Sequence, residues 1–351
     1  METSFQRGVG RSERMELATT DEGAAGRVPS RPLTASAEAN PPHAPERGWS
    51  WRLLGPFHVT GVFWYRFHGW IIRSIPAPLL GLVSVFFALF FFVVLRKIRA
   101  AIASNLEAVL GPCGWWERQR RIFLTIWSFG WCLNERLERL TTRRSFQIDV
   151  ETNEIWNETA RSGQGIVLIT AHLGNYEVGS MVPAQTEGRR VHLVREPEAN
   201  PEAQAFLEEV LSGFSQSRYA MHFQSDDPLQ GMELLDALRR GEIVAMQGDR
   251  PRQGTRSIDT TLFGRPFPLP PGPAALARLA DAPLLPVFVL REGRRRYRVV
   301  FRPPIRVPQT DDRAADLAAT MRQVAADVEW AIRRAPYQWF CFRRLWPEPP
   351  A

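Results

Sequence analysis

At 351 residues the chain is long enough to bury a sizeable core, and one domain of about 200–250 residues with appendages fits this length. Its net charge of +7 comes almost entirely from arginine, because Lys97 is the only lysine. Such a charge suits phosphate-rich partners: nucleic acid, anionic lipid or a phosphorylated cofactor. Cys113, Cys132 and Cys341 are scattered, so the cysteines indicate neither a disulfide framework nor a zinc site.

Residues 1–48 mix proline, serine, alanine, arginine and glutamate without hydrophobic periodicity. This composition predicts a disordered, solvated tail. No apolar run follows Met1, so a standard cleavable signal peptide is not indicated. Glu2 stands where N-terminal myristoylation requires glycine, so that modification is not indicated either.

Residues 49–99 are expected to anchor the chain in a membrane. No residue from Ile75 to Leu95 is charged, and a helix over 75–95 would be about 31 Å long, which matches the hydrocarbon core of a bilayer. Aromatic residues precede this run and basic residues follow it: Trp64, Tyr65 and Trp70, then Arg96, Lys97 and Arg99. We therefore predict one transmembrane helix with its carboxyl end in the cytoplasm, although Arg66 and Arg73 weaken the charge contrast. The alternative is a helix buried inside a soluble protein.

Residues 100–150 are expected to be helical. The stretch from Trp115 to Leu140 combines large aromatic side chains with several arginines. A helix of this composition lies either in the membrane interface or against the rest of the protein, and the sequence does not choose between the two.

Residues 151–346 alternate between strand and helix patterns. The expected strands are 166–170, 191–194, 242–247, 284–290 and 297–301, and the expected helices are 201–214, 228–240, 273–280 and 313–334. This alternation predicts an α/β layered domain with a mostly parallel central sheet. Functional side chains then gather at the carboxyl ends of the strands.

His172 directly follows the expected strand 166–170, and Glu177 lies five positions later. In a continuous helix the two side chains would point about 140° apart, so they converge only if the chain turns at Gly174-Asn175. A neutral imidazole oriented by a carboxylate is a general base, able to take a proton from a hydroxyl that attacks a carbonyl. The alternative is a histidine and a glutamate that are each satisfied locally at a strand end.

An ordered series of short motifs surrounds this pair. It comprises Asn105-Leu106, His172 to Glu177, Arg195 followed by Asn200-Pro201, Gly241-Glu242 leading into Gly248-Asp249, Phe263-Gly264, Pro286-Val287-Phe288 and Pro336-Tyr337-Gln338-Trp339. On these residues the chain resembles the bacterial lipid A biosynthesis acyltransferases, the late acyltransferases of the wider histidine-x4-acid superfamily. The resemblance implies an enzyme of the bacterial inner membrane, single-pass, with its catalytic domain on the cytoplasmic side. It also implies transfer of a fatty acyl chain from an acyl carrier protein, or from coenzyme A, to a hydroxyl of a lipid A precursor or related glycolipid.

In that reaction His172 is expected to be the base and Glu177 to orient its ring. Arg195 is the candidate for contact with an acceptor phosphate or the oxyanion, and its alternative is a surface arginine after a strand. Asp249 and Arg250 are expected to bind substrate or to form a structural ion pair. Because a thioester is already activated, the chemistry requires no metal, no cofactor and no covalent enzyme intermediate.

Two departures from the family pattern are visible. The family often carries a second acid two places after the residue matching Asp249, and here that place holds Pro251. Residues 253–257, Gln-Gly-Thr-Arg-Ser, resemble the phosphate-binding Glu-Gly-Thr-Arg-Ser element of glycerophosphate acyltransferases, with Gln253 in place of glutamate. The surrounding Asp249 and Phe263-Gly264 fit the lipid A family better, so we interpret this likeness as coincidental.

Three other functions fit parts of the sequence. A glycerophospholipid acyltransferase would use the same pair on a glycerol hydroxyl. A non-catalytic membrane scaffold would keep the apolar segment and tolerate loss of His172. A nucleic-acid-binding protein would explain the arginines, but no binding motif is present and the apolar segment argues against it, so we expect no nucleic-acid partner.

Overall fold

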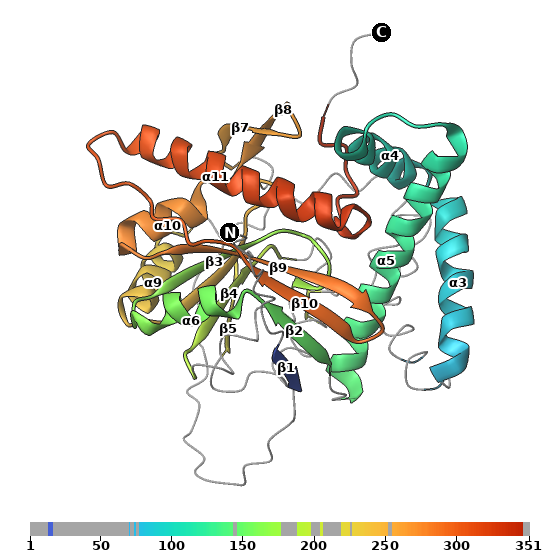
Figure 1. Cartoon of the computed structure of the whole chain (residues 1–351), viewed down its shortest axis with the longest axis horizontal. Helices are drawn as coiled ribbons and strands as arrows, with labels where there is room; N and C mark the ends of the chain where they lie inside the picture. The colour runs from blue at the N-terminus through green and yellow to red at the C-terminus, as the bar shows by residue number, and fades with distance from the viewer. Residues whose placement is uncertain are drawn as a thin grey trace, which may run out of the picture.

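The computed structural model describes residues 13–16, 70, 74, 77–142, 146–176, 188–197, 204–205, 219–224, 227–251 and 255–346. Within this part of the chain the central element is an eight-stranded sheet (Figure 1). Its strands, in spatial order, are β1 (Glu13–Glu16), β2 (Gln147–Glu151), β10 (Arg296–Phe301), β9 (Leu284–Gly293), β3 (Ile166–Thr170), β6 (Ile243–Gln247), β4 (Val191–Arg195) and β5 (Tyr219–Phe223). Only the β1–β2 and β10–β9 pairs are antiparallel. The predicted α/β domain with a mostly parallel sheet is confirmed.

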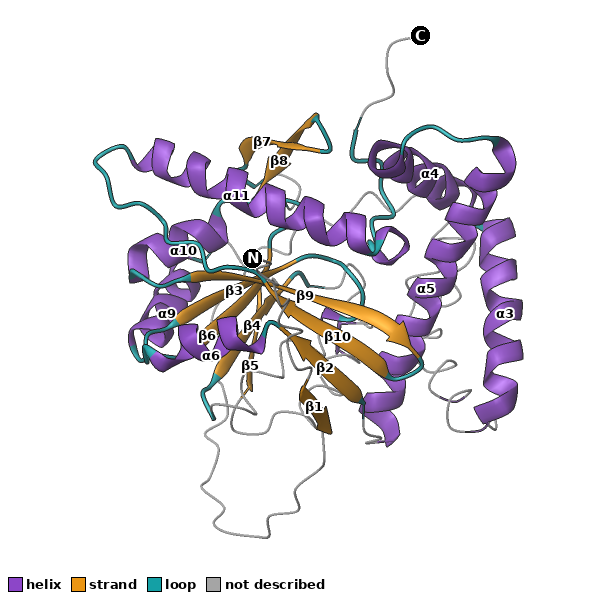
Figure 2. Ribbon diagram, viewed as in Figure 1, coloured by secondary structure: helices purple, strands orange, loops and turns teal. Residues whose placement is uncertain are grey.

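Both faces of the sheet are covered, which explains why β3 is apolar at successive positions. Its side chains alternate between two clusters: Val167 and Ile169 belong to one, and Ile166 and Leu168 to the other. The first cluster contains residues of α9 (Pro228–Arg239), α10 (Gly272–Ala280) and α11 (Arg313–Arg334), and the second contains residues of α6 (Asn153–Arg161). Figure 2 shows the helices on the two sides of the sheet.

A two-stranded hairpin, β7 (Ile258–Leu262) and β8 (Arg265–Leu269), lies beside α11 (Figure 1). Its turn consists of Phe263 and Gly264, which both have positive φ angles. The backbone N–H of Phe263 donates to a carboxylate oxygen of Glu329 on α11 at 2.7 Å. The motif Phe263-Gly264 therefore forms a tight turn that is tied to the terminal helix.

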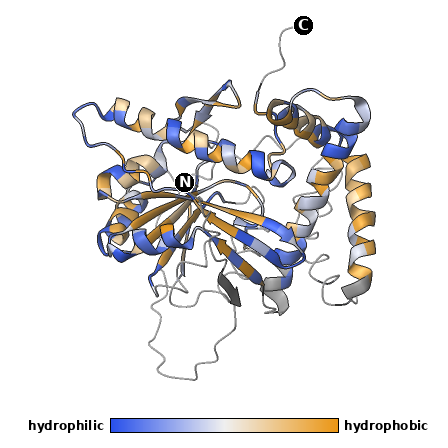
Figure 3. Ribbon diagram, in the orientation of Figure 1, coloured by the Kyte–Doolittle hydropathy of each residue, from blue (hydrophilic) through white to orange (hydrophobic). Residues whose placement is uncertain are grey.

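Three helices precede the sheet: α3 (Ala77–Val94), α4 (Arg96–Leu110) and α5 (Trp115–Thr142). One side of α3 packs along α5, and Ala88 is buried in a small cluster with side chains of α4 and α5. Figure 3 shows α3 as apolar along its length at the side of the molecule. Its exposed large apolar residues are Leu79, Leu82, Val85, Phe86, Leu89, Phe90, Val93 and Val94.

The predicted membrane helix, 75–95, corresponds to α3. Among the described residues, no helix is on its own both long and apolar enough to cross a bilayer. Residues 79–94 and α4 meet that length and composition test only together, as a pair bent by 91°.

Ion pairs with buried carboxylates attach α5 to β9 and to the turn between β9 and β10. Glu135 accepts hydrogen bonds from the Arg291 guanidinium at 2.9 and 3.0 Å, and from the backbone N–H of Arg295 at 2.9 Å. Glu138 pairs with the Arg295 side chain. Because removing one partner of a buried pair leaves an uncompensated charge, these contacts fix the position of α5 against the sheet.

Several elements differ from the sequence-based expectations. The tail expected to be disordered contributes β1, whose backbone extends the sheet by pairing with β2. The boundary expected at residue 151 falls within β2 (147–151), which belongs to the central sheet because it pairs with β10. Strand β5, helix α6 and the β7–β8 hairpin were not predicted. The expected helix 201–214 lies outside the described residues except at 204–205.

Candidate active site

Three candidate residues lie at one edge of the sheet. Strands β3, β6 and β4 are adjacent and parallel, so their carboxyl ends meet there. His172 follows the end of β3, Asp249 follows the end of β6, and Arg195 is the last residue of β4. The backbone N–H of Gly248 donates to the carbonyl of Thr170 at 2.8 Å, which ties the first two strand ends together. This is the edge at which parallel sheets present functional groups.

His172 and Asp249 form a hydrogen-bonded pair at this edge. The imidazole Nδ1 lies 2.6 Å from the carboxylate Oδ1. The Asp249 side chain is fully buried, whereas 18% of the His172 side chain is exposed. Since an ionised carboxylate only accepts hydrogen bonds, Nδ1 is the donor in this contact, and in the neutral ring the lone pair is then on Nε2. That tautomer is the one a general base needs.

Asp249 is held in its ionised form by its neighbours. Burial on its own raises the pKa of a carboxyl group, but His172, Arg250 and the Trp339 indole together hold the pKa of Asp249 well below its usual range. The indole Nε1–H of Trp339 donates to Oδ2 at 3.2 Å. The carboxylate therefore bonds His172 with one oxygen and Trp339 with the other.

The loop that carries His172 has a backbone that requires glycine. Gly174 has a φ of +58°, and a Cβ at this position would lie 2.1 Å from the carbonyl oxygen of Val289. Its N–H donates to the carbonyl of Gln338 at 3.0 Å, and the N–H of Phe340 donates to the carbonyl of His172 at 2.9 Å. The predicted turn at Gly174 is confirmed, and the segment around residues 338–340 holds it in place.

A second buried connection joins this loop to α5. Asn175, which is buried, donates from its amide nitrogen to the Tyr297 hydroxyl at 3.3 Å. The Tyr297 hydroxyl in turn donates to Glu135 of α5. Two elements that are distant in sequence, β10 and α5, thus help to position the loop after β3.

The chain after α11 is anchored to α4 by Asn105. The buried amide of Asn105 donates to the carbonyls of Cys341 and Arg343 at 3.2 and 2.8 Å and accepts from the N–H of Leu345 at 3.1 Å. These bonds fix the segment that contacts the His172 loop, and they give a structural role to the motif Asn105-Leu106.

The predicted site residues have different outcomes. The structure brings His172 and Asp249 together and places Arg195 at the same sheet edge. Arg250 donates from Nη1 to the carbonyl of Phe340 at 3.2 Å, so it binds the terminal segment. Glu177 lies outside the described residues, and its expected role stays a prediction.

The sequence left two roles open for Asp249, contact with substrate and a structural ion pair, and the structure shows its carboxylate paired with His172. Its carboxylate is fully buried, and both oxygens are engaged by His172 and Trp339. In the described structure the carboxylate hydrogen-bonded to the His172 ring is that of Asp249, the contact that the sequence analysis expected from Glu177.

Sequence reasoning did not identify Trp339, Gln338 or Asn175 as contributors to the site. The only signal for the first two was their place in the terminal motif Pro336–Trp339, and Asn175 was noted only as a turn residue.

Among the described residues, no group of three or more histidine, cysteine, aspartate or glutamate side chains is placed to hold a metal ion.

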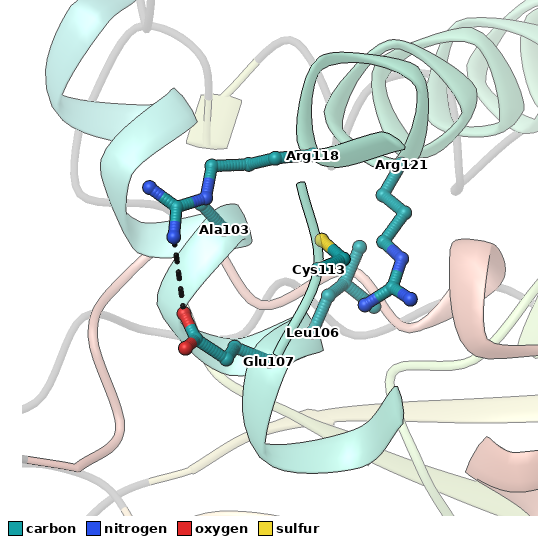
Figure 4. A pocket seen from close by; sticks show the side chains of 6 residues that line it. All are labelled: Ala103, Leu106, Glu107, Cys113, Arg118 and Arg121. Atoms are coloured by element: carbon teal, nitrogen blue, oxygen red, sulfur yellow. Dashed lines mark ion pairs between the residues drawn. The ribbon is translucent and has the colours of Figure 1, made fainter. Parts of the chain in front are cut away.

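A shallow pocket lies apart from the pair, between α4 and the start of α5 (Figure 4). It is lined by Ala103, Leu106, Glu107, Cys113, Arg118 and Arg121. Across it Arg118 forms an ion pair with Glu107, with a nitrogen–oxygen distance of 3.6 Å (Figure 4). None of these residues belongs to the candidate site.

Comparison with known proteins places the chain in a family. Over 191 residues it is 27% identical to phosphatidylinositol mannoside acyltransferases from two Mycobacterium tuberculosis strains, which covers 53% of this chain and 55% of theirs. The chain thus spans about half the length of the curated relatives it matches. A Thermotoga maritima structure, the 1-acyl-sn-glycerophosphate acyltransferase PlsC, aligns over 71% of this chain and 95% of its own with 11% identity and a TM-score of 0.30.

The family comparison covers most of the chain. The model of the family described as bacterial lipid A biosynthesis acyltransferase matches residues 48–348. The match includes the apolar helix α3, the paired His172 and Asp249 and the terminal segment around Trp339. The chain belongs to the bacterial lipid A biosynthesis acyltransferase family.

Proposed function

We propose that the protein transfers a fatty acyl chain from an acyl thioester to a hydroxyl of a lipid, with His172 as the general base. The observation that carries this proposal is the His172–Asp249 pair, 2.6 Å between Nδ1 and Oδ1, at the carboxyl edge of the sheet. The donor is acyl carrier protein or coenzyme A, and the acceptor is a lipid A precursor or related glycolipid. Family membership supports this acceptor class.

In the reaction, Nε2 of His172 takes the proton from the acceptor hydroxyl as its oxygen attacks the thioester carbonyl. A tetrahedral intermediate forms with negative charge on the former carbonyl oxygen. The carbon–sulfur bond then breaks, and the imidazolium returns its proton to the leaving thiolate. The products are an ester and a free thiol, and the enzyme is regenerated without a metal or a covalent intermediate.

Asp249 stabilises the imidazolium that forms during this cycle and keeps Nδ1 as the protonated nitrogen. Arg195, at the end of β4, is proposed to contact the acceptor phosphate or the oxyanion. Arg250 is proposed to have two roles: it binds substrate, and it supports the site through its bond to the carbonyl of Phe340 in the terminal segment. Glu177 is retained as a second acidic candidate from the histidine-x4-acid spacing.

The proposed location is the bacterial inner membrane, with the catalytic domain on the cytoplasmic side. The support is the apolar face of α3, whose exposed residues include Phe86 and Val93. Basic residues follow directly at Arg96, Lys97 and Arg99. A lipid acceptor resides in the same bilayer, so this location would bring acceptor and base together.

A second acceptor class is a phosphatidylinositol mannoside. It is supported by the 27% identity, over 191 residues, to proteins with that acyltransferase name. Both acceptors are glycolipids with a hydroxyl to acylate, and the same pair of residues would serve either.

The test is mass spectrometry of lipids from cells with the gene deleted, compared with the same cells complemented by wild-type protein or by His172→Ala. We expect one lipid to lack a single acyl increment in the deletion strain, and wild-type protein alone to restore it. The mass and headgroup of that lipid identify acceptor and chain. Restoration by His172→Ala would contradict the assignment of the base, and an unchanged lipid profile would contradict lipid acylation.

A further inference from the structure

We infer that Trp339 is a positioning residue for the reaction, which rests on the proposed role of His172. The indole N–H of Trp339 donates to the second oxygen of Asp249. This bond sets how strongly the Asp249 carboxylate stabilises the protonated form of His172. Neither the family match nor the sequence motifs assign it this role.

The first observation is how the Asp249 carboxylate is bonded. Oδ1 lies 2.6 Å from Nδ1 of His172, and Oδ2 accepts the indole N–H of Trp339 at 3.2 Å. The Asp249 side chain is fully buried, so solvent does not compete for these oxygens. In such surroundings each donor to a carboxylate has a large effect on the charge that the carboxylate offers to its other partner.

The second observation is that the backbone fixes Trp339 against the His172 loop. Leu173 and Trp339 form an isolated antiparallel bridge. On either side of this bridge, the N–H of Phe340 donates to His172 and the N–H of Gly174 donates to Gln338. These contacts therefore fix the position of Trp339 relative to the loop that carries His172.

The same segment is also bonded to the loop that carries Asp249. Arg250 donates to the carbonyl of Phe340 at 3.2 Å, and Arg343 donates to the carbonyl of Pro251 at 3.0 Å. The ring of Trp339 lies 6.2 Å from that of Phe263 and 6.4 Å from that of Trp346, measured between centroids. The segment thus contacts both the loop of His172 and the loop of Asp249, and it supplies a hydrogen-bond donor to the Asp249 carboxylate.

The chemical consequence has a definite sign. An N–H donor to Oδ2 stabilises the carboxylate and weakens it as a base, in agreement with the lowering effect of Trp339 on the pKa of Asp249. If the donor is removed, the carboxylate binds the imidazolium more tightly. His172 then keeps its proton to a higher pH, and less of the neutral base is present at a given pH.

The test compares Trp339→Phe with Trp346→Phe in the full-length protein. Trp339→Phe keeps a buried aromatic ring and removes the donor to Asp249 together with part of the indole ring, and the control variant shares the second loss. Trp346→Phe is the matched control, since Trp346 packs in the same aromatic cluster but donates to the carbonyl of Pro266 at 3.1 Å. The probe is diethyl pyrocarbonate, which reacts with neutral imidazole, and peptide mass spectrometry follows its addition to His172 as a function of pH.

We expect the midpoint of His172 modification to move to higher pH in Trp339→Phe by roughly half a pH unit or more. Trp346→Phe should keep the wild-type midpoint. In an Asp249→Asn background, Trp339→Phe should have no further effect, because the two changes act on one interaction. A wild-type midpoint in folded Trp339→Phe would overturn the inference and leave Trp339 with a packing role alone.

A second measurement needs no change at Trp339. The chain has 12 tryptophans, and their indole N–H groups give separate signals in a ¹H–¹⁵N spectrum. Asp249→Asn should displace one of these signals, and an unchanged set would contradict the contact. Neither readout uses a substrate. If the wild-type protein proves unable to transfer acyl groups, the proposed function fails while the role of Trp339 toward Asp249 is still decided.

Discussion

His172 and Asp249 lie 77 residues apart in the chain, yet their side chains meet at 2.6 Å. Their contact depends on the order of the strands: β3 and β6 are parallel neighbours, and each residue follows the end of its strand. The contact therefore depends on the architecture of the sheet and not on the local spacing of one motif.

The first prediction concerns the turn after His172. Gly174→Ala should lower acyl transfer by roughly 100-fold or more, because the new Cβ would lie 2.1 Å from the Val289 carbonyl and displace the loop that carries the base. The measurement is the steady-state rate of thiol release from the acyl thioester in the presence of acceptor.

Gly163→Ala is the control for backbone strain. Gly163 also has a positive φ, +67°, but a Cβ added there would meet no heavy atom within 4 Å beyond its own chain neighbours. Both variants lose the freedom of glycine, at about 1 kcal/mol, and only one of them clashes. Equal rates for the two variants would show that contact with Val289 does not position the loop.

The second prediction concerns the attachment of α5. Glu135→Gln should lower the free energy of unfolding by about 3–5 kcal/mol, because it removes one charge of a buried pair with Arg291 and weakens the contact with Tyr297. Glu117→Gln, on the same helix, removes the pairs that an exposed carboxylate forms with Arg120 and Arg121 and should have little effect. The measurement is thermal unfolding in detergent. Equal transition temperatures for the two variants would contradict the proposed anchoring of α5.

The third prediction concerns the cysteines. Burial raises the pKa of Cys132 to about 12 and also raises the pKa of Cys341. Since the thiolate is the reactive form, roughly one Cys132 in 10⁴ is reactive at pH 8, and this fraction grows tenfold with each pH unit towards 12. Cys113, which lines the shallow pocket in Figure 4, is partly exposed.

Iodoacetamide at pH 8 should therefore label Cys113 in the folded protein and leave Cys132 and Cys341 unmodified, as followed by peptide mass spectrometry. Raising the pH to 10 should speed the labelling of Cys132. Labelling of Cys132 at the rate of Cys113 at pH 8 would contradict the burial of this part of α5.

The local features of the site were predictable from the sequence, and the long-range ones were not. The apolar run 166–170 predicts a buried strand, and the structure places His172 directly after β3 with a turn at Gly174. The partner of His172 depends on which strand lies beside β3. Local pattern carries no information on that choice, so the sequence indicates a nearby acid, Glu177, and leaves Asp249 either to bind substrate or to form a structural ion pair.

The same limit explains the other omissions. The contact between Glu135 and Tyr297 joins residues 162 positions apart, and the contact between Trp339 and Asp249 joins residues 90 positions apart. Strand β2 carries polar residues at alternate positions and lies beside β10, which comes much later in the chain. Its place in the sheet is decided by that pairing and not by its own composition.

The central claim is that Asp249 makes His172 an effective base. Its most direct test is kcat/KM for acyl transfer by Asp249→Asn, measured beside Glu177→Gln in the same assay. The change keeps the shape of the side chain and removes its charge, so we predict a loss of roughly 10²- to 10⁴-fold, larger than the loss in Glu177→Gln. A wild-type value for Asp249→Asn, with the loss found in Glu177→Gln instead, would contradict the account.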